Sequence, residues 1–301
     1  MRRTLRFLHP SLLRHMLRTY IKYAVTVVTY SYVSFVGVLW LVQRKLQYFP
    51  SRNSPPDVCK LPSIFHEIQV FEVLTLDGLK LSGWLWPRRI LGKYSHIFVL
   101  HLHGNAGSRF HRLNWALNIR EQFGCAIALF DYRGYGGNVG SINETCLIRD
   151  GIAAITWASE IAAKSDQKLV LHLESIGSAI GLNALYEMST TVHIDGIIVE
   201  GGLSSCYDVA KQTLKYVPVG ILMTDKWERT ALSASKINHT IRFLSLHGKA
   251  DRIVPLWSGR RLYDAASCIQ KEFVEFKNGG HNDLMYHIGY FSAIESLYKS
   301  L

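Results

Sequence analysis

The pattern of apolar and polar positions divides the chain into two parts. Residues 23–43 are 21 consecutive uncharged residues, bracketed by Lys22 and Arg44. At about 1.5 Å per residue, a helix of that length spans roughly the ~30 Å hydrocarbon core of a bilayer. Beyond it, apolar runs alternate with amphipathic stretches, which is typical of a mostly parallel sheet covered by helices on both faces.

The apolar runs place the strands of this α/β fold. Two of them, 68–76 and 79–86, are expected to form a hairpin across the tight Asp77-Gly78 turn. Further strands are predicted at 97–103, 125–132, 169–175, 196–200, 241–247 and 273–277, with helices near 108–123, 144–163 and 176–188. The predicted organisation is a basic tail over 1–22, a membrane anchor over 23–43, a Pro- and Ser-rich linker over 44–64, and a globular α/β domain over 65–301.

The strong positive charge belongs to the N-terminal part. The chain has 34 basic and 23 acidic residues, and nine of the basic residues but none of the acidic ones lie in 1–56, which leaves 25 against 23. A basic face for nucleic acid is therefore not expected on the domain, and the charge is that of membrane-flanking segments.

The N-terminal segment predicts a single-pass membrane protein. A signal peptide and a buried core helix are the less favoured alternatives, since the apolar run is long and precedes a complete domain. Basic residues on the N-terminal side give a small preference for a cytoplasmic N-terminus and a domain outside or in a lumen. The sequons at Asn143 and Asn238 fit that orientation. An Arg-rich, acid-free start also resembles a mitochondrial presequence, so that localisation stays open.

The cysteines and acidic residues do not indicate a metal site. Five cysteines are scattered without a C-x-x-C pair, and no His/Asp/Glu cluster has ligand spacing. We expect mostly buried free thiols, with one disulfide left open, and no metal or cofactor.

Candidate catalytic residues follow the predicted strands, where the sites of open α/β sheets form. Ser175 lies between a strand and a helix, the position of a nucleophile elbow, and the Ile176 N–H would face an oxyanion at the helix N-terminus. A helix N-cap is the alternative role for Ser175. Asp251 and His281 follow the last two strands, and the order Ser, Asp, His is that of α/β-hydrolases. His281 would act as the base and Asp251 would orient it.

Two Gly-rich turns follow the neighbouring strands. His-Gly-Asn-Ala-Gly at 103–107 could present backbone N–H groups to an oxyanion, or be an ordinary turn. Asp-Tyr-Arg-Gly-Tyr-Gly at 131–136 is expected to shape a wall of the site, with structural roles for Asp131 and Arg133.

With these motifs, and with Gln-Tyr-Phe-Pro at 47–50 after the anchor, the chain resembles the single-pass, membrane-anchored α/β-hydrolase domain-containing proteins, especially the kind numbered thirteen in that series. The resemblance implies a Ser175, Asp251 and His281 triad, and oxyanion N–H groups from Asn105 and Ile176. The chain departs from the family at Leu173, where the family has Gly, and at Ser178, where a further Gly is common.

Related proteins of this kind act on acyl esters or thioesters, including palmitoyl groups on proteins. The resemblance therefore implies a serine hydrolase acting at the bilayer on an acylated protein or lipid, with no cofactor and no nucleic acid partner. Two alternatives remain: a serine peptidase on the same fold, and a catalytically silent membrane-tethered binding protein, which Leu173 favours.

Overall fold

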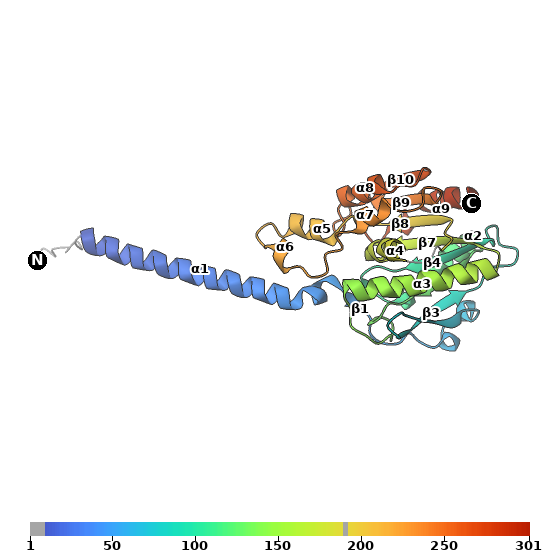
Figure 1. Ribbon diagram of the computed structural model, residues 1–301, viewed down its shortest axis with the longest axis horizontal. Helices are drawn as coiled ribbons and strands as arrows, with labels where there is room; N and C mark the ends of the chain where they lie inside the picture. The colour runs from blue at the N-terminus through green and yellow to red at the C-terminus, as the bar shows by residue number, and fades with distance from the viewer. Residues whose placement is uncertain (1–9, 189–191) are drawn as a thin grey trace, which may run out of the picture. The chain divides into compact units, whose positions relative to one another are not determined.

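A computed structural model describes residues 10–188 and 192–301 of the chain (Figure 1). The chain divides into two units between Gln43 and Arg44. Residues 1–9 of the predicted basic tail lie outside the described residues, whereas residues 10–22 continue the helix of the anchor.

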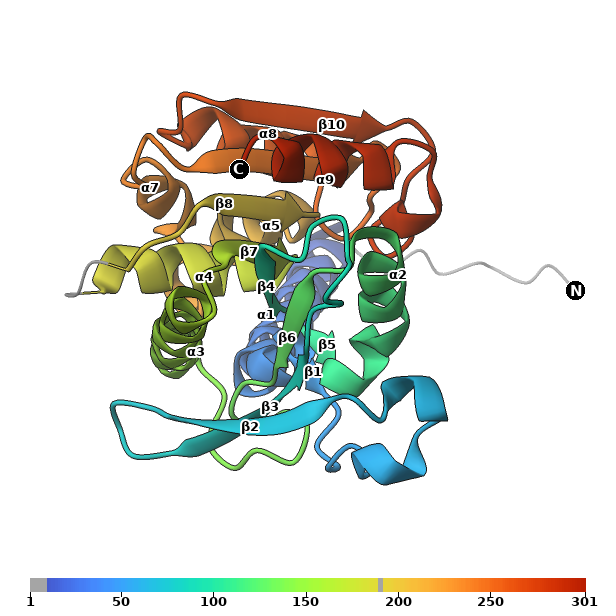
Figure 2. The same ribbon diagram turned by 90° about the vertical axis from the view of Figure 1, so that its right-hand side faces the viewer.

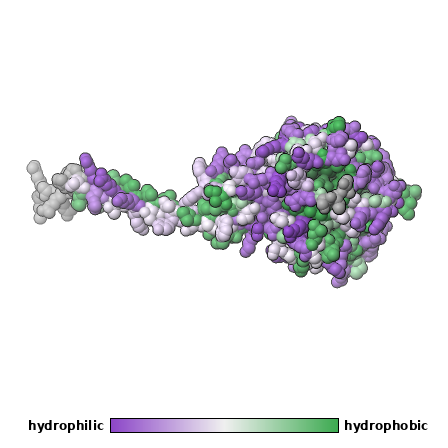
Figure 3. Space-filling model, in the orientation of Figure 1, coloured by the Kyte–Doolittle hydropathy of each residue, from purple (hydrophilic) through white to green (hydrophobic). Residues whose placement is uncertain are grey.

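The helix α1 (Pro10–Gln47) contains the predicted membrane span. It is 38 residues long, or about 57 Å at 1.5 Å per residue, so it exceeds the span at both ends. Its apolar side chains are exposed along its length (Figure 3), and within the described residues it is the one helix long and apolar enough to cross a membrane. The helix continues past Arg44 and Lys45, both good helix formers, and ends shortly before Pro50.

The second unit is built on an eight-stranded sheet with the order β10-β9-β8-β7-β4-β6-β3-β2. Strands β2 and β3 form the predicted hairpin, β3 runs antiparallel to β6, and the remaining pairs are parallel. The strands are β2 (Gln69–Leu74), β3 (Lys80–Trp86), β4 (Ile97–Leu102), β6 (Ala126–Phe130), β7 (Lys168–Glu174), β8 (Gly196–Glu200), β9 (Arg242–Gly248) and β10 (Lys271–Phe276), with a two-residue pair β1 (Phe49–Pro50) and β5 (Ala106–Gly107) outside the sheet.

Helices cover both faces of the sheet, and Figure 2 shows them on either side of its strands. One face carries α3 (Glu144–Lys164), α4 (Ile176–Glu187), α7 (Thr230–Ala234) and α8 (Leu256–Ala265), and the other carries α2 (Leu113–Phe123) and α9 (Tyr290–Lys299). The short helices α5 (Cys206–Thr213) and α6 (Val219–Leu222) follow β8, and 3₁₀ turns occur at η1 (Val58–Lys60), η2 (Ser63–Phe65), η3 (Arg109–Arg112) and η4 (Leu284–Tyr286).

The apolar faces of the strands explain this layering. The central strands β4 and β6 are buried at every position, as expected for strands with helices on both sides. Two clusters of buried side chains lie on opposite faces of the sheet, one against α3, α4 and α8 and one against α2 and α9. The predicted α/β-hydrolase architecture is confirmed, and all five cysteines are free thiols.

Residues 44–64 differ from the linker expected from their Pro and Ser content. Tyr48 is buried, and its hydroxyl accepts a hydrogen bond from Trp227 Nε1 at 3.1 Å. Arg44 forms an ion pair with Asp225 at 3.0 Å. The segment therefore begins the globular unit, because its aromatic and charged side chains have partners there.

Candidate active site

The turn between β7 and α4 holds Ser175 in an unusual backbone conformation. Its φ is 52° and its ψ is −119°, a region that non-glycine residues rarely adopt and that clusters at functional sites. The side chain does not cap α4, so the helix N-cap alternative does not describe it. The backbone N–H of Ser175 donates to the Glu200 carbonyl at 2.8 Å, which ties the turn to the end of β8.

The structure brings the three predicted triad residues into one chain of contacts. His281 Nε2 lies 2.9 Å from Ser175 Oγ, and His281 Nδ1 lies 2.6 Å from Asp251 Oδ2. Since a carboxylate only accepts, Nδ1 is the protonated nitrogen and Nε2 is free to accept from the serine hydroxyl. Asp283, the other acid near His281, instead accepts from the Gly280 N–H.

Asp251 is held in place for this role. Its Oδ1 accepts the backbone N–H groups of Ile253 and Val254, each at 2.8 Å. Burial acts to raise the pKa of Asp251, but the hydrogen bond and charge of His281, together with these two amides, outweigh it and lower the pKa. The carboxylate is therefore the stable form beside the imidazole.

A glycine on the following helix accommodates Leu173. Leu173 is fully buried, and a Cβ at Gly181 would lie only 2.6 Å from Leu173 Cδ2. The absent side chain at 181 leaves the room that Leu173 fills. The departure from the family's Gly is therefore compatible with the elbow geometry that Ser175 adopts.

The neighbouring residues complete the elbow. A Cβ at Gly177 would lie 2.1 Å from the carbonyl oxygen of Leu102, so helix and strand pack here through backbone. Ser178 Oγ donates to the Ser175 carbonyl at 2.6 Å and accepts from the Leu203 N–H at 3.3 Å. The hydroxyl at 178 therefore braces the turn from within the helix.

The loop after β4, which contains Asn105, is fixed from two sides. The Asn105 carbonyl accepts from the Phe49 N–H and from the Tyr135 hydroxyl, each at 2.9 Å. The Asn105 side-chain amide donates to the Gln47 carbonyl at 2.9 Å. The Gln-Tyr-Phe-Pro and Asp-Tyr-Arg-Gly-Tyr-Gly motifs thus both support this loop. Ile176 is the first residue of α4, so its N–H has no acceptor within the helix.

An ion pair links the elbow to the same loop. Arg112 Nη2 and Nε lie 2.6 and 2.9 Å from the two carboxylate oxygens of Glu174, and Arg112 Nη1 donates to the Ala106 carbonyl at 2.7 Å. Burial acts to raise the pKa of Glu174, but the Arg112 charge and hydrogen bonds hold it well below its usual range. This fork geometry fixes the distance between two segments that flank Ser175.

Asp131 and Arg133 have structural partners, as expected. Asp131 Oδ1 accepts from the Arg109 N–H at 2.6 Å. Arg133 forms ion pairs with Asp150 at 2.6 Å and Asp77 at 2.8 Å.

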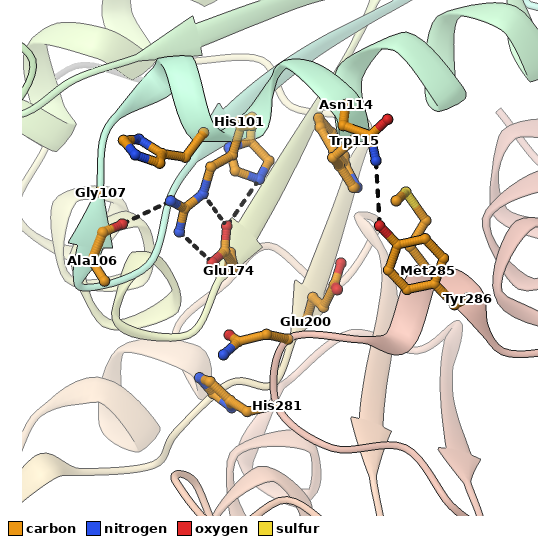
Figure 4. A pocket seen from close by; sticks show the side chains of 13 residues that line it. His101, Ala106, Gly107, Asn114, Trp115, Glu174, Glu200, His281, Met285 and Tyr286 are labelled. Atoms are coloured by element: carbon orange, nitrogen blue, oxygen red, sulfur yellow. Dashed lines mark hydrogen bonds and ion pairs between the residues drawn. The ribbon is translucent and has the colours of Figure 1, made fainter. Parts of the chain in front are cut away.

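A cavity of about 480 Å³ opens beside His281 (Figure 4). Its wall includes Glu174 and Glu200, which end two adjacent strands, and His101 on β4. Burial lowers the pKa of His101 well below its ordinary value. Glu174 and Glu200 are not among the site residues predicted from the sequence, although each is the last residue of its strand. Arg112 lies in a helical stretch, and no spacing rule pairs it with Glu174.

Comparisons with known proteins agree with this fold. No family model matches the chain. The chain is 33% identical over 268 residues to the uncharacterized membrane protein YNL320W of Saccharomyces cerevisiae, covering 86% of this chain and 89% of that one. It is 25% identical over 271 residues to the α/β hydrolase domain-containing protein WAV2 of Arabidopsis thaliana, covering 83% and 85%.

Solved structures share the architecture at lower identity. The esterase Pf2001 of Pyrococcus furiosus superposes with a TM-score of 0.63 at 17% identity, covering 83% of this chain and 98% of that one. An acetyl xylan esterase from Paenibacillus superposes with a TM-score of 0.56 at 17% identity, covering 80% and 86%. With an N-terminal helix able to cross a membrane, this sheet order and these relatives, the chain belongs to the membrane-associated α/β-hydrolase domain-containing proteins.

Proposed function

We propose that the protein is a membrane-anchored serine hydrolase that cleaves acyl ester or thioester bonds of lipids or palmitoylated proteins. The observation that carries the proposal is the contact chain from Ser175 Oγ through His281 to Asp251, at 2.9 and 2.6 Å. Ser175 is the nucleophile, His281 the general base and Asp251 the group that orients the imidazole.

The reaction has two halves. His281 Nε2 takes the proton of Ser175 as Oγ attacks the acyl carbonyl, and the imidazolium then gives that proton to the departing alcohol or thiol. Water attacks the acyl-enzyme in the second half, with His281 again acting as the base. Asp251 remains ionised throughout, which its lowered pKa supports.

The developing oxyanion is assigned to the backbone N–H groups of Asn105 and Ile176. The position of Ile176 at the first turn of α4 supports this role, since an unpaired N–H at a helix N-terminus favours negative charge. The loop after β4, which contains Asn105, is held in place by hydrogen bonds from the Phe49 N–H, the Tyr135 hydroxyl and the Asn105 side-chain amide. Fixed donors of this kind contribute about 10²–10³-fold to turnover each.

The segment between β8 and β9 bears on the kind of substrate. It provides only the short helices α5, α6 and α7. A small cap of this kind suits an acyl chain presented at a membrane, where the N-terminal helix would hold the enzyme.

The test is labelling of the detergent-solubilised full chain with a fluorophosphonate, which reacts with activated serines. Wild type should be labelled, whereas Ser175→Ala and His281→Ala should not. Ser296→Ala, an exposed serine on α9, is the matched control and should label like wild type. Equal labelling of wild type and Ser175→Ala would refute the assignment of the nucleophile.

A catalytically silent binding protein is the second candidate, since Leu173 occupies the family's Gly position. It would take first place if correctly folded wild type were not labelled.

A further inference from the structure

The segment between β8 and α7, which contains α5 and α6 (Figure 1), carries large apolar side chains on its outside. Leu214, Tyr216 and Ile221 lie within eight residues of one another and are 42%, 89% and 88% exposed. In α5 and α6, all of whose residues the structure describes, Val219 alone is buried. Exposed apolar side chains that gather in this way mark a surface that contacts a membrane or another protein.

The charge of this segment has one sign. Residues 209–224 contain Lys211 and Lys215, both exposed, and no acidic residue. The acidic side chains on either side, Asp208 and Asp225, are each paired with an arginine. The segment therefore presents positive charge beside its apolar side chains.

The same segment is fixed close to the point where the chain leaves the predicted membrane span. Arg44 directly follows that span in the sequence and forms an ion pair with Asp225 at 3.0 Å. The carbonyl of the next residue, Lys226, accepts the backbone N–H of Tyr207, at the start of α5, at 2.9 Å. Ile221 precedes Asp225 by four residues, so the two Cα atoms are at most about 14 Å apart. Arg44 and the segment belong to one unit of the structure.

A phospholipid surface has the chemistry that complements this segment. Apolar side chains enter the boundary between headgroups and acyl chains, while lysines are attracted to lipid phosphates. Tyrosine is enriched at the same depth. The headgroup region on each side of a bilayer is about 5–8 Å thick, so a segment held this near to the end of the span can reach it. This position favours lipid over a soluble protein as the partner.

We propose that residues 211–223 form a second membrane-binding surface, which docks onto the phospholipid headgroups beside the anchor. Leu214, Tyr216 and Ile221 enter the bilayer surface, and the two lysines lie against the phosphates. The segment follows β8, which ends at the same edge of the sheet as β7 and Ser175. Docking therefore holds the edge that carries the candidate site toward the lipid, whereas a helix alone would leave the domain free to turn. The proposal does not depend on the chemistry of Ser175.

The experiment measures lipid contact of the full chain in phospholipid nanodiscs, at one copy per disc. A nitrobenzoxadiazole fluorophore is attached at Ile221→Cys, with Cys59→Ser removing the exposed native cysteine. Ile90→Cys is the matched control, because Ile90 is 89% exposed and lies before the start of β4, at the opposite edge of the sheet. Lipids that carry a nitroxide below the headgroup should quench the fluorophore at 221 and leave the fluorophore at 90 bright.

A second variant separates docking from mere nearness to the anchor. Leu214→Glu combined with Tyr216→Glu should lower the ratio of docked to undocked protein by about 10-fold or more for each residue, and so remove most of the quenching at 221. Leu76→Glu, at a leucine that is 81% exposed in the β2–β3 turn, should keep it. An unchanged urea unfolding midpoint shows that these variants fold.

Three outcomes would overturn the proposal. The first is equal quenching at 221 and 90, or quenching at neither. The second is quenching at 221 that survives the two glutamates, since the fluorophore would then reach lipid without docking. The third is a blue-shifted fluorophore at 221 that nitroxide lipids do not quench, which would mean that protein covers the segment. Fluorophosphonate labelling of the same samples tests Ser175 separately, so the failure of either proposal can be told from that of the other.

Discussion

Leu173 and Gly181 should behave as one packing unit, which a double-mutant cycle can measure. A Cβ at Gly181 would lie 2.6 Å from Leu173 Cδ2 and 3.1 Å from Cδ1, so an alanine at 181 overlaps the leucine. Leu173 is fully buried in the cluster of side chains against α4. Each residue therefore sets the size that the other can have.

The magnitudes follow from burial and helix propensity. Leu173→Ala should destabilise by about 3–5 kcal/mol, since it leaves a cavity in the core. Gly181→Ala gains about 1 kcal/mol of helix propensity but loses about 1–3 kcal/mol to overpacking. In the double variant the new methyl fills part of the cavity, so the overlap disappears and the propensity gain remains. The double variant should be about 2 kcal/mol more stable than the sum of the single changes predicts.

The measurement is urea unfolding of the four proteins in the same detergent, followed by tryptophan fluorescence. Leu169→Ala with Gly181→Ala is the control cycle. Leu169 is also buried on β7, but it lies four residues from Leu173, about 13 Å along the strand. That control should be additive within about 0.5 kcal/mol. Additivity of the Leu173 and Gly181 changes as well would refute the packing argument.

The same reasoning predicts the effect of restoring the family residue. Leu173→Gly removes the side chain that fills the space beside Gly181, so it should loosen the elbow and slow fluorophosphonate labelling. A variant that gains hydrolysis absent from wild type would contradict this and favour the silent binding protein.

Three further predictions concern an ion pair and a glycine near Ser175 and the two sequons. In wild type the lowered pKa of Glu174 adds stability that is present above pH 4.5 and lost as pH falls. Arg112→Ala should leave the largely buried Glu174 carboxylate without its partner and so raise the pKa of that carboxylate. The stability lost in this variant should therefore grow as pH rises from 4.5, and reach about 3 kcal/mol at pH 7 in urea unfolding. Gly177→Ala should abolish fluorophosphonate labelling, because its Cβ would lie 2.1 Å from the Leu102 carbonyl oxygen. If the domain is lumenal, Asn238→Gln but not Asn143→Gln should remove an endoglycosidase-sensitive mass shift, since Asn238 is exposed whereas Asn143 Oδ1 caps α3.

Much of the fold could be predicted from the sequence because most strands of the parallel sheet are short, largely apolar runs, although β10 interrupts its apolar residues with charged ones. The positions of Ser175, Asp251 and His281 could be predicted because each follows such a run, and parallel strands end at one edge. These predictions use only local sequence patterns and the order of the strands along the chain. They apply to side chains whose position depends on the backbone alone.

The remaining features depend on packing between segments distant in the chain. Arg112 and Glu174 are 62 positions apart in the chain, one in a helical stretch and the other at a strand end, and no periodicity relates them. Gly181, which leaves the room that Leu173 fills, lies on α4. From the sequence alone, a glycine in that helix could equally have had a purely local role. Residues 44–64 looked like a linker because Pro and Ser dominate their composition, whereas Tyr48 and Arg44 are fixed by partners at Trp227 and Asp225.

This misjudged segment also gives the Gln-Tyr-Phe-Pro motif a physical role. The Gln47 carbonyl and the Phe49 N–H bond the side chain and the carbonyl of Asn105, each at 2.9 Å. A loop that must present its backbone to a developing charge needs fixed peptide planes, because donors that reorganise during the reaction lose their advantage. Residues that directly follow the anchor provide part of that support. Gln47 and Phe49, which belong to the same unit as the candidate site, therefore hold the proposed oxyanion loop in place, and this gives the motif a role in the proposed catalysis.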